Sequence, residues 1–241
     1  MERLDRVLGN LGYCSRKQSA RFLRDFEVTV DTERLSDPSV KVDSNKVRIN
    51  NEPLDRPDGI FIMLNKPAGY ICSHDGGEGV LVYELLPHQW LSRNPLPSTI
   101  GRLDKDTTGV ILITDNTQLI HTLTSPKRTI DKEYEVTVHK ALTADLADAF
   151  MSGTLFLKGE DKPCLPAELT IVDETHAKVI LHEGRYHQVK RMFGHFGYIV
   201  TSLHRSRFGP YTLNGLESGS WKDLEMPKAY STPPQSPEGG F

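Results

Sequence analysis

Apolar and polar positions follow two different periods in the first part of the chain. Residues 4–11 carry apolar side chains at helical spacing, and Ser15 with Gln18 forms a capping-box pattern that predicts the start of a second helix. The segments 28–35 (VTVDTERL) and 47–54 (VRINNEPL) resemble each other, and each predicts a short strand that runs into a turn. We therefore expect a compact unit of about 55 residues ahead of the main domain.

The remainder of the chain mixes strand and helix patterns without a regular alternation of the two. Continuous or alternating apolar runs predict strands at 60–64, 110–113, 132–140, 167–173 and 177–184. Amphipathic patterns with capping residues predict helices at 115–124, 143–153 and 186–197. In the last of these, His187, Lys190 and Arg191 are expected to share the polar face. This interspersed order favours an α+β fold with a mixed sheet.

The composition is that of a globular protein of ordinary polarity. The 241 residues have a net charge of -3, and no apolar run approaches the ~20 residues of a membrane span. The N-terminus, MERLDRVLGN, is too charged for a signal peptide, so we expect a cytoplasmic protein. The three cysteines are widely spaced, which fits a reducing compartment and neither a disulfide framework nor a zinc site. The proline- and glycine-rich tail, 232–241, is expected to be disordered.

Positive charge is concentrated in two regions of this near-neutral chain. Residues 184–210 hold five Lys or Arg and no Asp or Glu, and residues 1–28 hold six bases against four acids. On the second expected helix Lys17, Arg21 and Arg24 fall on one face, which by itself could be an ordinary solvated face. Two separate basic regions suit a long polyanion such as RNA, because each neutralised phosphate releases counterions.

The stretch GRLDKDTTGVILITDN (101–116) places a crowded charged turn directly before a buried strand. Asp104 could be an ordinary turn acid, or it could face a cleft with Arg102 nearby. A cation brought in by the fold would keep Asp104 ionised, and an ionised carboxylate can act as a nucleophile. A metal site built on Asp104 and Asp106 is disfavoured, because the spacing lacks the Gly and Glu of a calcium loop. In isolation, Tyr134 is an ordinary strand aromatic whose ring could also stack on a base.

Three blocks of the sequence together resemble one known family. GRLDKDTTGVILITDN, LNKPAGYICS and EGRYHQVKRMFGHFGYIVTSLHRSRFG are similar to the bacterial ribosomal pseudouridine synthases that carry an N-terminal S4 RNA-binding domain. The resemblance extends to about Pro227. The short length and the motif YHQVKRM look most like the members that isomerise uridine 516 of 16S rRNA. Members that act on the large subunit usually have an Asn-Arg pair where this chain has Tyr186 and His187.

The resemblance implies an architecture and a set of roles. It implies an S4-type αα-β module at 1–57 and a catalytic domain at 60–231, built on a mixed, mainly antiparallel sheet. Asp104 would be the catalytic aspartate, Tyr134 the stacking tyrosine and Lys190 the basic partner of Asp104. The residues expected to contact or support the substrate are Arg102, Leu203, Arg185, His187 and Arg191 at the site, and Arg16, Lys17, Arg21 and Arg24 on the S4 module. Thr32 departs from the usual glycine of the S4 turn.

The same resemblance implies that no cofactor and no metal is needed, and that the protein acts as a monomer on ribosomal RNA. Two alternatives remain open on the sequence alone. One is a synthase of the same family that acts on 23S rRNA. The other is a non-catalytic RNA-binding or ribosome-assembly factor, which an S4 module alone would support. The chemical step that Asp104 performs is also open: attack at C1′, attack at the base, or proton abstraction.

Overall fold

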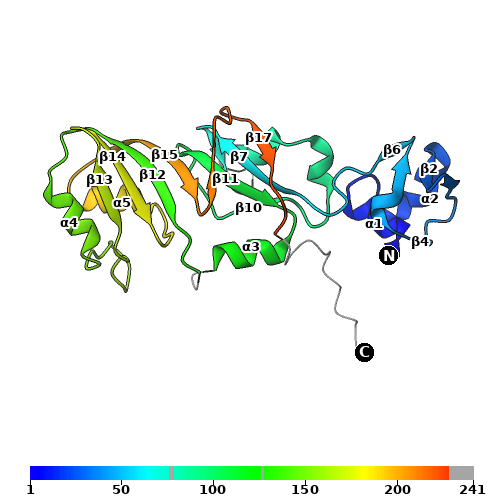
Figure 1. Cartoon of the computed structure of the whole chain (residues 1–241), viewed down its shortest axis with the longest axis horizontal. Helices are drawn as coiled ribbons and strands as arrows, with labels where there is room; N and C mark the ends of the chain where they lie inside the picture. Colours follow the sequence, from blue (N-terminus) through cyan, green and yellow to red (C-terminus); the bar gives the residue numbers. More distant parts are fainter. Residues whose placement is uncertain (76, 78, 126–127, 228–241) are drawn as a thin grey trace.

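The computed structural model describes residues 1–75, 77, 79–125 and 128–227, so the expected tail at 232–241 lies outside the described residues. Figure 1 shows an elongated molecule with the N-terminal module at one end. The helices α4 (Asp145–Met151) and α5 (Gln188–His195) lie at the other end. Among the described residues, no helix has the length and apolar character needed to cross a bilayer.

The N-terminal module packs two helices against short strands. Helix α1 (Leu4–Asn10) is followed by a 3-10 turn (Arg16–Gln18) and by α2 (Ser19–Asp25). A four-stranded sheet has the order β3-β2-β5-β6, and a separate pair joins β1 to β4. The bounds are β1 Glu2–Arg3, β2 Val28–Val30, β3 Glu33–Arg34, β4 Lys41–Val42, β5 Val47–Ile49 and β6 Glu52–Pro53, with a 3-10 turn at Ser44–Lys46. The buried side chains of these elements form a hydrophobic cluster separate from those of the main domain.

Local signals in this module are confirmed. Gln18 Oε1 accepts from the backbone N–H of Ser15 at 3.3 Å and completes the capping box. The two similar segments pair through β2 and β5, and each ends in a tight turn whose two residues have positive φ. One of these residues is Thr32, with φ 87°. A β-branched residue is unfavourable in this region, which explains why glycine is the usual choice there.

The main domain is built on a mixed, mainly antiparallel sheet, as expected. The described strands form one nine-stranded sheet with the order β13-β14-β12-β15-β11-β7-β17, to which β10 adds through β11 and β16 through β15. Their bounds are β7 Phe61–Lys66, β10 Ser98–Ile100, β11 Thr108–Thr114, β12 Lys132–Val138, β13 Glu168–Ile171, β14 His176–Leu181, β15 Val200–Phe208, β16 Tyr211–Thr212 and β17 Trp221–Asp223. A small parallel pair, β8 (Tyr70–Ile71) with β9 (Val80–Leu81), and 3-10 helices at Val82–Leu85 and His88–Ser92 lie outside this sheet.

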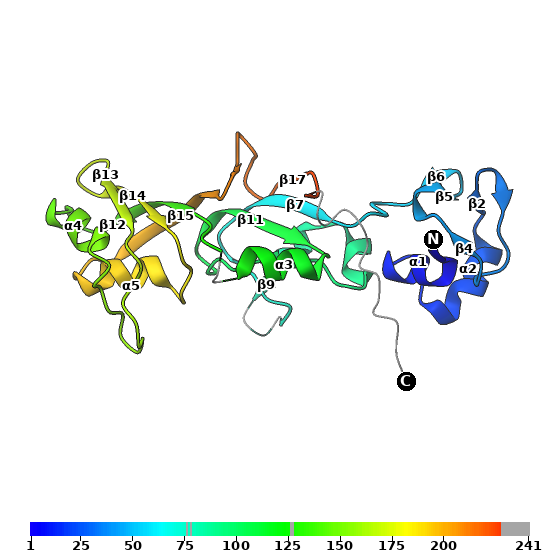
Figure 2. The same cartoon turned by 60° about the horizontal axis from the view of Figure 1, so that its bottom comes forward.

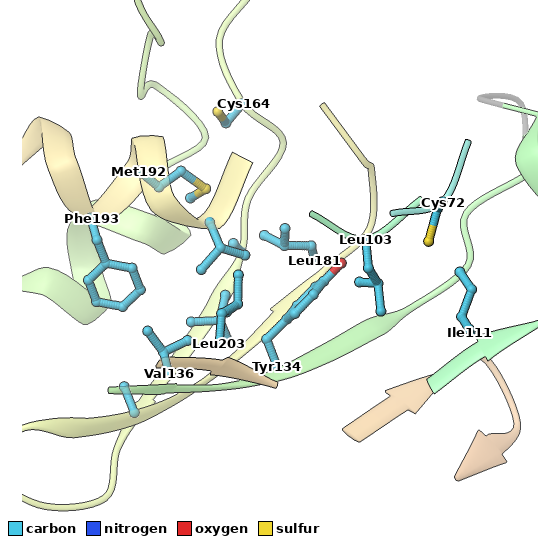
Figure 3. Close-up of a cluster of buried hydrophobic side chains, with 14 of the residues drawn as sticks. Cys72, Leu103, Ile111, Tyr134, Val136, Cys164, Leu181, Met192, Phe193 and Leu203 are labelled. Carbon is cyan, nitrogen blue, oxygen red and sulfur yellow. The ribbon is translucent and has the colours of Figure 1, made fainter. Parts of the chain in front are cut away.

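Both faces of the central strands are covered, which explains why their sequences are continuously apolar. On β11, Ile111 and Ile113 pack into the larger hydrophobic cluster, whereas Val110 and Leu112 pack into a smaller one. Helix α3 (Thr117–Thr124) contributes Leu119 to the smaller cluster. Figure 3 shows part of the larger cluster, where side chains from β11, β12, β15 and α5 meet.

The two halves of the sheet join at a short parallel contact between β11 and β15. Thr108 pairs with His204 and Gly109 pairs with Arg205. Gly109 has φ 105°, and a Cβ atom at this position would collide with the backbone of Arg205. Glycine is therefore required for the close approach of these strands. The contact lies directly after the charged turn singled out in the sequence.

Three helix boundaries differ from the expectations. Helix α3 starts at Thr117, two residues later than expected, and is capped by the side chain of Asn116, which accepts from Leu119 N. Asp115 does not cap the helix, because its carboxylate accepts from Ile60 N and pairs with Arg93. Helix α4 starts at Asp145 with no side-chain cap. Helix α5 starts at Gln188, because His187 has φ 47° and cannot belong to the helix.

The linker after the N-terminal module is fastened to the main domain through Arg56. Its guanidinium lies over the rings of Trp90 and Trp221, at 4.5 and 5.3 Å from their centroids. Its Nε and Nη2 donate to the two carboxylate oxygens of Asp223 at 3.0 and 2.8 Å. Arg93 donates to the carbonyls of Asp55 and Arg56 from the other side. These contacts, made by the side chain of Arg56 and by the carbonyls of Asp55 and Arg56, couple the orientation of the module to the main domain.

Candidate active site

The loop that carries Asp104 joins β10 to β11, and the side chain of Lys66 binds its backbone carbonyls. This lysine is fully buried, and its Nζ donates to the carbonyl oxygens of Asp104 at 3.0 Å and Thr107 at 2.8 Å. Two further carbonyls, of Pro67 and Lys105, lie at 3.1 and 3.3 Å. Burial lowers the pKa of the Lys66 ammonium. Four backbone acceptors around one ammonium fix the path of the loop.

The carboxylate of Asp104 lies between two basic side chains that come from a distant part of the sequence. Lys190 Nζ lies 3.1 Å from Asp104 Oδ2, and His187 Nε2 lies 3.1 Å from Asp104 Oδ1. Lys190 also donates to Asp106 Oδ1 at 2.6 Å. The fold therefore brings Asp104, Lys190 and His187 together, and it adds Asp106 as a second acid on the same lysine.

The shared ammonium shifts the ionisation of its neighbours. Partial burial acts to lower the pKa of Lys190, but hydrogen bonds to Asp106 and Asp104 outweigh it, so that pKa lies above its ordinary value. The hydrogen bond from Lys190 lowers the pKa of Asp106. Lys190 is thus a permanent cation at neutral pH.

A network of side chains fixes the turn from which His187 and Lys190 project. The buried side chain of Gln188 accepts from Arg185 N at 2.9 Å and donates to Glu183 Oε1 at 2.7 Å. The left-handed backbone of His187 then turns its ring toward the Asp104 loop while α5 carries Lys190. Sequence patterns placed His187, Gln188 and Lys190 on one regular helix, and the structure divides them between a turn and a helix.

Asp104 opens onto a cavity of about 1190 Å³ at the junction of the two halves of the sheet. Arg102, Lys190, His187 and Tyr134 also line this cavity. Figure 3 shows the ring of Tyr134 on β12, between Leu203 on one side and Leu103 on the other. Tyr134 is 9% exposed, so that its ring is supported by the core while it reaches the cavity wall. Leu203 is buried in the same hydrophobic cluster as Tyr134.

Two of the arginines expected at the substrate are engaged within the protein. Arg185 pairs with Glu183 and donates to the carbonyls of Lys162 and Pro163 at 2.7 and 2.6 Å. Arg191 donates to Glu160 at 2.8 Å and to the carbonyl of Lys158 at 2.6 Å. Arg191 therefore anchors the segment 158–163 to α5, and Arg185 anchors it to the turn before α5. Arg185 still lines the cavity.

The four residues of the N-terminal module that were expected to contact RNA are exposed. Arg16 and Lys17 lie in the 3-10 turn, whereas Arg21 and Arg24 lie in α2, so a single regular helix does not carry all four. Arg21 also pairs with Asp25 at 3.3 Å. Figures 1 and 2 place α2 and α5 near opposite ends of the molecule. The two basic regions are therefore far apart in the fold, as a long polyanion would require.

Two residues at the site, Lys66 and Arg205, were not predicted from the sequence. Lys66 could have been found, since a lysine at the end of a mainly apolar strand must be buried or turn away from the core. Arg205 is only 2% exposed and lines the cavity, and its Nε donates to Val110 O at 2.8 Å. Its Nη2 has no hydrogen-bond partner among the described residues. A basic residue on β15 carries no local sign that it will be buried.

Among the described residues, the side chains at the site do not form the ligand set of a metal centre. No group of three His, Cys, Asp or Glu side chains there is arranged to hold a metal ion. The carboxylates of Asp104 and Asp106 are instead bridged by the ammonium of Lys190.

Comparison with known proteins gives the family of both parts of the chain. Residues 60–195 match the RNA pseudouridylate synthase family, and residues 2–47 match the S4 domain. Ribosomal small subunit pseudouridine synthase A of Vibrio cholerae is 38% identical over 224 residues, which cover 92% of this chain and 95% of that protein. The protein of the same name from Escherichia coli K12 is 37% identical over 227 residues, with 92% and 96% covered. A crystal structure of a pseudouridylate synthase is similar with a TM-score of 0.64 and 33% identity, over 93% of this chain and 96% of the other.

Proposed function

Because this chain is a member of the RNA pseudouridylate synthase family with an N-terminal S4 domain, we propose that it isomerises one uridine of small-subunit ribosomal RNA, uridine 516 of 16S rRNA. The proposal is supported by the relatives named ribosomal small subunit pseudouridine synthase A, which align over nearly the full length. In this proposal residues 1–57 dock the RNA and residues 60–231 perform the reaction. The protein acts as a monomer in the cytoplasm, where ribosomal RNA is available.

One observation supports the catalytic assignment above all others. The carboxylate of Asp104 opens onto the cavity, and Lys190 and His187 hold both of its oxygens at 3.1 Å. The carboxylate is therefore fixed in direction between two basic side chains. A protein that only bound RNA would gain nothing from an anion facing a phosphate chain. Asp104 is the group that acts on the sugar or the base.

The chemistry requires little beyond this carboxylate. The bond between C1′ and N1 breaks, the uracil rotates, and a bond forms between C1′ and C5. C5 then loses its proton and N1 gains one, so the composition of the nucleotide is unchanged and no co-reactant is consumed. The carboxylate of Asp104 acts on the sugar or on the base, and the ring of Tyr134 supports the uracil while it rotates. Arg102, at the cavity wall, binds the nucleotide.

The target uridine must leave its helix before it can enter the cavity. Flipping a base out costs a few kcal/mol, which contacts to the RNA backbone must offset. Exposed Arg16, Lys17, Arg21 and Arg24 on the N-terminal module supply such contacts at a distance from the site. The interdomain contact through Arg56 sets the distance between the two RNA-binding regions.

Mapping of pseudouridines in ribosomal RNA tests this function. RNA from a strain that lacks the gene is compared with RNA from the same strain complemented with the gene. The proposal predicts that one position in 16S rRNA, uridine 516, loses and regains its modification. A position in 23S rRNA that responds instead would assign the enzyme to the large subunit, and no change at any position would overturn the proposed function.

A further inference from the structure

Tyr186 is a large aromatic side chain left exposed at the wall of the cavity that holds Asp104. It is 69% exposed, more than any other Phe, Tyr or Trp among the described residues. Its ring stacks on His187, with centroids 3.8 Å apart and planes 20° apart. A single exposed apolar residue is ordinary, but this one forms a two-ring stack whose inner ring contacts the carboxylate of the site.

The backbone that carries the two rings is fixed before any ligand arrives. The carbonyl of Tyr186 accepts from Arg191 Nη1 at 3.1 Å, and Arg191 is itself held by Glu160. Next to it, Arg185 N donates to the buried side chain of Gln188. A preorganised aromatic surface loses little conformational freedom when a flat ligand stacks on it.

The cavity has room for more than the flipped nucleotide. Its volume, about 1190 Å³, exceeds the roughly 300–1000 Å³ of most single-ligand sites. Tyr134 lies at the core side of this space, whereas Tyr186 and Leu165 are the exposed apolar groups of its wall. Leu165 N donates to Glu183 Oε1 at 3.0 Å, so its segment is tied to the turn that carries Tyr186.

We propose that the stacked pair of Tyr186 and His187 is a platform for the nucleobase that neighbours the target uridine in the RNA strand. Once the target base has turned out of its helix, the adjacent base has lost a stacking partner, and the exposed face of Tyr186 replaces it. Base stacking on aromatic side chains accepts any base, so the platform adds affinity without a sequence requirement. This inference rests on the proposed function and adds a second base site to it.

The test compares Tyr186→Ala, Tyr186→Phe and Phe156→Ala, which removes a ring that is 54% exposed and outside the described lining of the cavity. On an RNA oligomer that the wild-type protein modifies, Tyr186→Ala is expected to lower kcat/KM about tenfold, mainly through KM. Tyr186→Phe and Phe156→Ala are expected to stay within about twofold, since the first retains the ring and the second lies elsewhere.

A direct readout uses the same RNA with 2-aminopurine beside the target, bound to the Asp104→Asn protein so that no turnover occurs. Binding is expected to quench the 2-aminopurine fluorescence, and the added Tyr186→Ala substitution is expected to remove that quenching while Tyr186→Phe keeps it. Unchanged quenching with Tyr186→Ala would overturn the platform, even if activity falls. Absence of pseudouridine formation by the wild-type protein would instead overturn the proposed function, and a fluorescence titration with an oligomer that contains uridine 516 would still report on the platform.

Discussion

Lys190 Nζ lies 3.1 Å from Asp104 Oδ2 and 2.6 Å from Asp106 Oδ1, so that one ammonium serves two carboxylates. The side chain of Asp104 is 26% exposed, whereas that of Asp106 is 73% exposed. The inner acid faces the cavity, and the outer acid helps to hold the lysine in place. This arrangement explains why a turn with two acids precedes a buried strand.

Replacement of Lys190 by Met removes the cation and leaves the carboxylate of Asp104 with His187 alone. We expect kcat to fall by about 10- to 100-fold, because a partly buried carboxylate that loses its cationic partner is less well oriented and its charge is no longer compensated. The matched control is Asp106→Asn, which weakens the outer contact and is expected to change kcat by less than about fivefold. Equal rates for Lys190→Met and wild type in single-turnover assays would refute the pairing.

The pH dependence of stability follows from the same group. The raised pKa of Lys190 contributes stability that is fully present below the unfolded value of about 10.4 and is lost as the pH rises through the folded pKa. The lowered pKa of Asp106 contributes stability that is present above about 3.9 and is lost as the pH falls through its folded pKa. The difference in unfolding free energy between wild type and Lys190→Met should therefore stay constant from about pH 5 to 10. Denaturant titrations across this range would contradict the account if the difference changed near neutral pH.

Lys66 is expected to be a positioning residue for the Asp104 loop. Lys66→Met leaves the carbonyls of Asp104 and Thr107 without their buried donor, which should lower the unfolding free energy by about 2–4 kcal/mol. Activity should fall further than the folded fraction does, because the loop loses its support. Lys222→Met, on the edge strand β17, is the control and should have little effect on either quantity. Normal activity of the folded Lys66→Met protein would show that the loop is held by other contacts.

The N-terminal module should contribute to RNA affinity through charge. Arg21→Ala combined with Arg24→Ala is expected to weaken binding and to reduce the slope of log K against log salt by about 1.5, from roughly 0.7–0.9 per phosphate contact. Lys178→Ala removes one positive charge from an exposed lysine on β14, outside the N-terminal module, and should leave the slope unchanged. If the slope of the double variant equals that of wild type in titrations of 16S rRNA fragments, α2 lies outside the RNA interface.

Arg56 should control the orientation of the N-terminal module. Arg56→Ala removes the contacts to Trp90, Trp221 and Asp223 together. We expect a broader distance distribution in small-angle X-ray scattering and a higher KM for long RNA, with kcat within about twofold, since the contacts lie away from Asp104. Arg56→Lys should restore little, because an ammonium cannot make the bidentate contact. A scattering profile identical to that of wild type would contradict this role.

The sequence predicted those features that depend on neighbouring residues. The capping box of Ser15 and Gln18 and the buried strand at 110–113 require no knowledge of the fold, and both are present. The α+β class was predicted from the order in which strand and helix patterns follow one another, and each of those patterns also depends only on neighbouring residues.

Features that depend on distant contacts could not be predicted from local patterns. The helical period extends through Tyr186 and His187, but the buried network of Gln188 and Glu183 imposes a left-handed residue there and turns His187 to Asp104. Likewise, a sequence cannot tell that Arg191 is neutralised by Glu160, because that pairing depends on how the segment 158–163 folds back. Tertiary packing decided each of these cases.

The most direct measurement is pseudouridine formation in 16S rRNA incubated with purified wild-type protein or with Asp104→Asn. Asn has nearly the same size as Asp but carries no negative charge, so the account predicts no pseudouridine with the variant and RNA affinity within a few-fold of wild type. Conversion of uridine by Asp104→Asn at a rate near that of wild type would contradict the central claim that the carboxylate of Asp104 performs the reaction.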